Sequence, residues 1–179
     1  MTFQDLLFSF QEIASAFVRD LSVWWVLTPI FLLWIFMELY FGEYKYEELG
    51  FSSALANGIS LLWVSATSLR LFFLGELFIV SLPFFFLLFF LFYGLFVVWA
   101  AFWHRLSEHT TSIVASPSIV YFFSTLSVLW GQRLLEVTLP IGIALFLLFV
   151  VIFFIFFLIK RKLGFLGELE TVKHVGENS

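Results

Sequence analysis

Long runs of apolar residues constrain this chain more than any other feature. Residues 84–96 read FFFLLFFLFYGLF, and residues 150–160 read VVIFFIFFLIK. A water-exposed surface carrying such runs would aggregate, whereas a membrane-spanning helix needs about 20 mostly apolar residues. Hydrophobic residues make up 62% of the chain and charged residues 12%, against about 45–50% and 25% in soluble domains. The sequence therefore predicts an all-α polytopic integral membrane helix bundle in contact with membrane lipids.

Five apolar runs are long enough to be considered as spans, and together they form a bundle over residues 21–159. They cover residues 21–40, 51–70, 77–103, 113–130 and 137–159. The fourth run is the weakest, because serines dilute it and Pro117 interrupts it early. The alternative is four spans plus a re-entrant segment. We favour five, since 18 residues still lie within the range of lengths that can cross a bilayer.

The segments that flank the bundle are short. Residues 1–20 place apolar side chains at helical spacing on one face, which predicts an amphipathic interfacial helix. That helix either contacts lipid or docks on the protein's own surface, and the pattern leaves both open. Residues 160–179 are too few to form a domain, so we expect a flexible or partner-docked tail.

The balance of Lys and Arg residues predicts which side of the membrane the tail occupies. In the five-span arrangement, six basic residues lie on the tail's side, and three lie opposite. The six are Lys45, Arg105, Lys160, Arg161, Lys162 and Lys173, and the three are Arg19, Arg70 and Arg133. The four-span alternative gives the same balance. Because basic residues favour the cytoplasmic side, we expect a cytoplasmic C-terminus.

The run at residues 51–70 differs from its Phe- and Leu-rich companions because it is rich in small and polar residues. One helical face carries Ser53, Asn57, Ser60 and Thr67, and a neighbouring strip pairs Ala54 with Gly58. Small residues let helix backbones approach closely in lipid. We therefore expect this run to be the inner helix of the bundle, with a polar seam that is either a wet path or a dry packing surface.

Charged residues at membrane depth are candidates for function because they are costly there. Glu38 lies near the end of its span, where it can face Asn57 across the helix pair. This arrangement suits a cation or proton site, although a hydrated helix end is the simpler interpretation. Four further charges lie near two tight turns on one side of the membrane: Arg70, Glu76, Arg133 and Glu136. They form either an ion-pair cluster or side chains that reach the lipid headgroups.

Metal, cofactor and nucleic-acid functions find little support. The chain has no Cys, and its formal charge is −4. Its basic residues are scattered except at residues 160–162, so we expect no nucleic-acid partner. The spacing of His104 and His109 resembles the first histidine cluster of membrane di-iron desaturases. That family needs several clusters, and the remaining histidine, His174, lies in the tail. We therefore expect a solvated loop and neither metal nor cofactor.

Three functions remain open on these residues. The first is a small, non-enzymatic, oligomeric membrane protein, a channel or transport-type component in which the 51–70 helices of several copies meet. The second is an accessory or scaffold subunit of a larger membrane complex. The third is a membrane enzyme that acts on a lipid, for which the sequence offers no convergent acid, base or metal ligands.

Overall fold

The structure is a computed structural model that describes residues 3–43, 50–74 and 81–177. Within these ranges the chain is all helical and has no strand. The elements are α1 (Phe3–Arg19), a 3₁₀ turn η1 (Leu21–Val23), α2 (Trp24–Glu43), α3 (Phe51–Leu74), α4 (Leu82–Phe102), α5 (Glu108–Val114), α6 (Pro117–Gly131) and α7 (Leu139–Glu177). The chain is thus an all-α helix bundle, as its sequence predicts.

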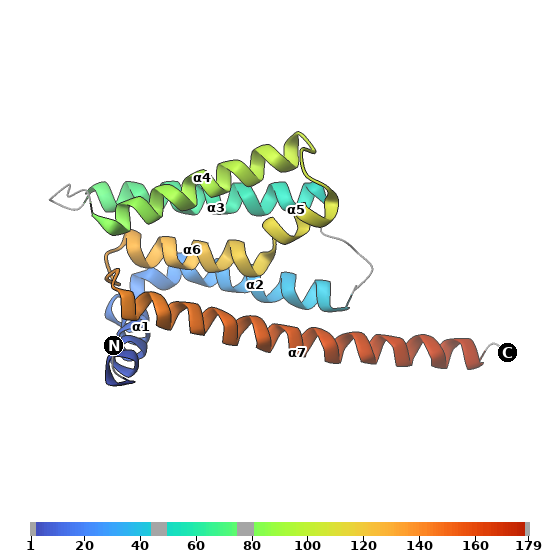
Figure 1. The fold of residues 1–179 in the computed structure, drawn as a ribbon. Coiled ribbons are helices and arrows are strands. Elements are labelled where there is room, and N and C mark those ends of the chain that lie inside the picture. Colours follow the sequence, from blue (N-terminus) through green and yellow to red (C-terminus); the bar gives the residue numbers. More distant parts are fainter. Residues whose placement is uncertain (1–2, 44–49, 75–80, 178–179) are drawn as a thin grey trace.

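Among the described residues, five segments are long and apolar enough to cross a membrane, which makes the chain a multi-pass membrane protein. They are Leu21–Tyr40, Phe51–Leu74, Leu82–Phe102, Glu108–Gly131 and Leu139–Lys162. They run along a common direction, and the two termini lie at opposite ends of the bundle, as an odd number of spans requires (Figure 1). The fourth segment runs along the bundle as α5 followed by α6, so the five-span prediction is confirmed.

The prediction of the inner helix was wrong, because α6 and not α3 lies at the centre. In its span 61% of the residues are buried, against 17–33% in the other four spans. In Figure 1, α3 and α4 lie on one side of α6, and α2 and α7 lie on the other. Helix α3 buries one face only and exposes Trp63 by 71%. The serines that dilute the apolar character of α6 are thus a mark of burial inside protein and not of a weak span.

Three buried hydroxyls of α6 are satisfied by its own backbone. Ser124, Thr125 and Ser127 each donate to the carbonyl four residues earlier, at distances of 2.8–2.9 Å. Such bonds let Ser and Thr sit in a low-dielectric interior without an unpaired donor. Ser127 also lies 3.2 Å from Ser65 of α3, oxygen to oxygen. These contacts join the two helices through small polar side chains.

Glycines set how closely three helices approach. A Cβ added to Gly58 would lie 2.9 Å from a methyl of Val97, and one added to Gly94 would lie 2.9 Å from the backbone nitrogen of Leu62. A Cβ on Gly131 would lie 2.6 Å from that of Ser68. The close approach expected of the small-residue strip therefore exists, but it joins α3 to α4 and α6 of the same chain.

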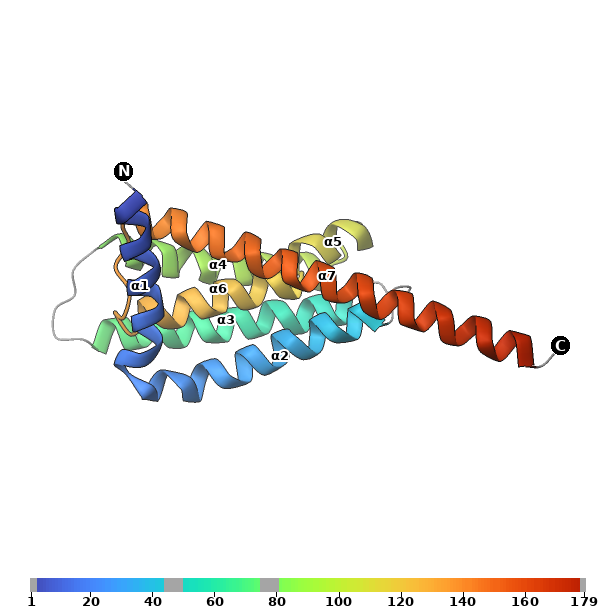
Figure 2. The same ribbon diagram turned by 90° about the horizontal axis from the view of Figure 1, so that it is seen from below.

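Helix α1 lies across one end of the bundle, roughly perpendicular to the spans (Figures 1 and 2). Ile13 and Ala16 are buried, and α1 packs against α7. Leu7, Ala14 and Val18 share a neighbouring strip that is exposed. Docking on the protein and contact with lipid are thus compatible, because they use different strips of the same helix. At the corner that follows, hydrogen bonds from the Ser22 hydroxyl and amide lower the pKa of Asp20.

The last helix is longer than the sequence suggests. Helix α7 continues without a break to Glu177 and projects beyond the other helices (Figure 1). We expected residues 160–179 to be a flexible or partner-docked tail, and the structure continues α7 through residue 177 of this segment. The helical periodicity of this segment is not interrupted by Pro, and its Gly residues lower helix propensity without preventing a helix.

Candidate polar site at the break in the central helix

The central helix is broken at membrane depth, between α5 and α6. Pro117 opens α6, and because it has no N–H, the ladder of backbone hydrogen bonds cannot continue through it. The carbonyls at the break are satisfied by side chains of other helices. Tyr93 of α4 donates to the Val114 carbonyl at 2.7 Å, and Asn57 of α3 donates to the Ala115 carbonyl at 2.9 Å.

Both polar atoms of the Asn57 side-chain amide form hydrogen bonds. Its Nδ2 bonds to the broken helix, and its Oδ1 accepts a hydrogen bond from the Tyr121 hydroxyl at 3.2 Å. The exposed fractions of Asn57 and Tyr121 are 2% and 3%. A polar side chain this deeply buried is stable only if its donors and acceptors are paired. Asn57 therefore locks α3 to both halves of the fourth span.

Glu38 of α2 is the most deeply buried charged residue among those described, with an exposed fraction of 1%. Its Oε1 accepts a hydrogen bond from the Ser118 hydroxyl, and its Oε2 forms an ion pair with the Lys160 ammonium of α7. Ser118 lies in the first turn of α6, where the helix dipole favours a negative charge. The Lys160 side chain is 37% exposed, so the pair connects the interior with the surface.

The structure divides the predicted seam into two sets. Glu38 and Asn57 are both buried, although a hydrated helix end was the simpler interpretation for Glu38. Each is bonded to the fourth span, which was not predicted to lie there. Ser53, Ser60 and Thr67 are only partly buried. The buried hydroxyls of α3 are instead Ser65 and Ser68. The predicted face was therefore rotated slightly from the one that the fold buries.

Three residues of this site were missed by the sequence analysis: Ser118, Tyr121 and Lys160. Ser118 and Tyr121 were hidden in the run whose status as a span was in doubt. Lys160 was interpreted only as a basic residue at the membrane boundary. The signal that could have found them is the single proline early in a serine-rich span, since a broken membrane helix needs polar partners at the break.

Of the four charges predicted to lie near the tight turns, Arg70, Arg133 and Glu136 lie near the other end of the bundle. Arg133 adopts a positive φ of 54° in the turn after α6. Its Nη2 donates to the Phe72 carbonyl at 3.1 Å, and the guanidinium carbon lies 4.8 Å from the centre of the Phe72 ring. Arg70 and Glu136 are exposed. Glu76 lies outside the described residues.

His104 lies in the turn after α4, whereas His109 lies in the first turn of α5, so the expected solvated loop is partly helical. His104 and His109 are exposed, and His104 packs its ring edge against Phe51, with the two centroids 4.0 Å apart. Within the described parts of the chain, no three His, Cys, Asp or Glu side chains come together as potential metal ligands. The candidate site is therefore the Glu38, Lys160 and Ser118 group together with the Asn57 and Tyr121 group beside it.

Chemically, this arrangement offers a carboxylate, an ammonium and two hydroxyls beside a helix N-terminus and two carbonyls that accept side-chain hydrogen bonds. Such a set can hold or exchange a proton, or exchange the ammonium for a small cation. Comparisons of the chain with protein-family models, with curated proteins and with solved structures find no match.

Proposed function

We propose that this chain is a non-enzymatic, transport-type membrane component in which the Glu38–Lys160 pair responds to protons or small cations. One observation carries the proposal: a carboxylate with 1% exposure is bonded to the N-terminus of a broken span and to a lysine that is one-third exposed. Ionisable residues inside a bundle are costly and are functional candidates for that reason. Broken helices with buried polar partners are a recurring form of ion site in transporters.

The geometry favours a switch in place of an open pore. The polar groups of Asn57 and Tyr121 are closed on one another and on the Ala115 carbonyl. Separation of Lys160 from Glu38 by a competing proton or cation would remove the ion pair that joins α7 to α2, while the apolar contacts of α7 with α1 and α2 would remain. We therefore propose that movement of α7 relative to the rest of the bundle accompanies the exchange, with the C-terminus on the cytoplasmic side and the N-terminus outside.

The experiment is flux in liposomes that contain the purified chain. We expect a proton or monovalent-cation flux above that of empty liposomes, and we expect Glu38→Gln to abolish it. Ser53→Ala serves as the matched control, because Ser53 lies only partly buried on α3 and outside the bonded site. Absence of flux for protons, Na⁺ and K⁺ in the unmodified protein, or undiminished flux in Glu38→Gln, would contradict the proposal.

A second candidate function is an accessory or scaffold subunit of a larger membrane complex. The observation that favours it is α7, which continues as a helix to Glu177 beyond the rest of the bundle (Figure 1). A projecting helix of this kind is a natural arm for a partner. The expected oligomer through α3 is less favoured, because Gly58 already contacts α4 of its own chain. The mass of the particle purified from its native membrane distinguishes unrelated partner chains from a single chain or a homo-oligomer.

The third candidate, a membrane enzyme that acts on a lipid, has the weakest basis. Its case would need an acid, a base or metal ligands that converge on one cavity. The described charged residues near the two ends of the bundle do not form such a group with a nucleophile.

A further inference from the structure

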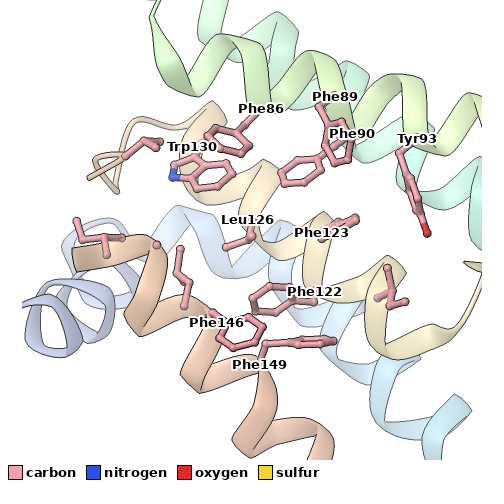
Figure 3. Close-up of a pocket in the computed structure, with 15 residues that line it drawn as sticks. Phe86, Phe89, Phe90, Tyr93, Phe122, Phe123, Leu126, Trp130, Phe146 and Phe149 are labelled. Atoms are coloured by element: carbon pink, nitrogen blue, oxygen red, sulfur yellow. The ribbon is translucent and has the colours of Figure 1, made fainter. Parts of the chain in front are cut away.

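A lateral groove lies between α4 and α7, with α6 as its floor (Figure 3). Its volume is about 630 Å³. Phe86 and Phe89 of α4 form one wall, and Phe146 and Phe149 of α7 form the other (Figure 3). Phe89 and Phe146 are exposed by 51% and 64%. Because these helices are spans, the groove opens sideways toward the hydrocarbon region of the bilayer.

The groove has a polar end. Trp130 and Val137 line both the groove and a second cavity of about 450 Å³, which also includes Ser81, Arg133 and Glu136. These residues lie at the ends of three spans, level with the lipid headgroups. An apolar groove is thus continuous with a pocket that carries one positive and one negative side chain.

A buried donor lies at the junction of the two cavities. Trp130 is 4% exposed, and its indole N–H finds no acceptor among the described residues. Its ring stacks on Phe90 at 5.7 Å between centroids, and Figure 3 shows the indole nitrogen on the side facing away from Phe90. An unpaired buried N–H costs free energy, so an acceptor oxygen supplied by a ligand at this junction would be favoured.

We propose that this site holds one phospholipid whose headgroup carries both a phosphate and a primary ammonium. One acyl chain fills the groove. The phosphate accepts hydrogen bonds from Trp130 and from Arg133, which keeps its contact with Phe72. The ammonium binds Glu136. Charge complementarity selects this headgroup, because a purely anionic lipid would leave Glu136 unmatched and a quaternary ammonium cannot donate a hydrogen bond to it.

An acyl chain fits the groove better than a helix of another protein. A spanning helix about 10 Å wide and 30 Å long occupies on the order of 2,000 Å³, well above the volume of the groove. Large aromatic rings also line both walls, whereas helix interfaces in membranes favour small residues. Apolar contact alone gains little in a bilayer, since lipid tails are equally apolar. Selective retention must therefore come from the polar end.

The test uses the purified full-length chain and an equimolar mixture of three phospholipids with identical acyl chains. Their headgroups carry a primary ammonium, a quaternary ammonium or no cation. After washing, the lipids that stay bound are identified by native mass spectrometry. One charge-assisted hydrogen bond supports a preference of about tenfold for the primary ammonium lipid. Equal retention of the three lipids would overturn the proposal.

Two variants connect the binding to the site. Gly142→Leu places a side chain in the groove, where a Cβ meets nothing within 4 Å, so the fold should persist while all three lipids are lost. Glu136→Gln should keep total binding but remove the headgroup preference. The control for the first variant is Ala56→Leu, which creates the same side chain at an exposed position of α3. Two results would overturn the assignment. One is unchanged retention of the three lipids by Gly142→Leu, and the other is that this variant loses a bound protein chain and not a lipid.

Discussion

Glu38 is buried and Lys160 is partly exposed, so removing either charge should lower the free energy of unfolding by a different amount. Lys160→Met leaves the buried Glu38 carboxylate without its charged partner, and broken buried pairs cost about 3–5 kcal/mol. Glu38→Gln leaves a lysine that is 37% exposed and that water can solvate, so we expect a loss of only about 1–2 kcal/mol. Unfolding of the two variants in detergent measures the difference. Equal losses would show that the pair is not buried as the structure places it.

Gly131 and Gly142 form a second comparison at the scale of the residue. A Cβ at Gly131 would lie 2.6–2.8 Å from the backbone and Cβ of Ser68, whereas one at Gly142 meets nothing within 4 Å. We expect Gly131→Ala to lower the free energy of unfolding by about 1–3 kcal/mol. Gly142→Ala should leave it unchanged or raise it by up to about 1 kcal/mol, through helix propensity. The thermal stability of both variants in one detergent provides the measurement.

The break between α5 and α6 is the element on which the polar site depends. Tyr93→Phe removes one bond, to the Val114 carbonyl, and keeps the ring, so it should cost about 1 kcal/mol. Asn57→Leu removes the bond to Ala115 and leaves the Tyr121 hydroxyl unpaired. We expect a loss of about 2–4 kcal/mol, roughly one penalty for each group left unsatisfied. Equilibrium unfolding should rank Asn57→Leu as clearly worse, and the reverse order would argue against the proposed network.

Helix α1 packs on one end of the bundle, and a substitution that undocks it should leave the other helices folded. Ala16 is fully buried and α1 packs against α7, so Ala16→Asp should undock the helix by burying an unpaired charge. Amide hydrogen exchange over residues 3–19 should then accelerate while that of α6 stays slow. Val18→Ser, on the exposed strip, is the control and should leave the exchange of α1 unchanged. Faster exchange of α6 in Ala16→Asp would show that α1 is integral to the bundle.

At the scale of the whole molecule, the five spans place the two ends of the bundle on opposite sides of the membrane. The chain contains no Cys, so single introduced cysteines can be labelled without background. With the C-terminus cytoplasmic, an impermeant maleimide added outside intact cells should label Asp20→Cys and should not label Ser107→Cys. Both positions are exposed. The reverse labelling pattern would invert the topology and the direction of the proposed exchange.

The sequence alone determined the class of the protein, favoured five spans over four, and singled out Glu38 and Asn57 as polar residues within spans. These follow from local composition, because the bilayer acts as a solvent that imposes length and apolarity on each span separately. The sequence also predicted a narrow helix face, because small residues such as Ala54 and Gly58 let helix backbones approach closely in lipid.

Only the tertiary structure decided which span is central and what Glu38 and Asn57 contact. Serines in a span fit either a weak crossing or a buried one, and the choice depends on neighbours that are distant in sequence. Glu38 meets Ser118 and Lys160, and Asn57 meets Ala115 and Tyr121. Such pairings depend on how the helices are rotated and ordered around α6, which packing sets across the whole molecule and which no single span encodes.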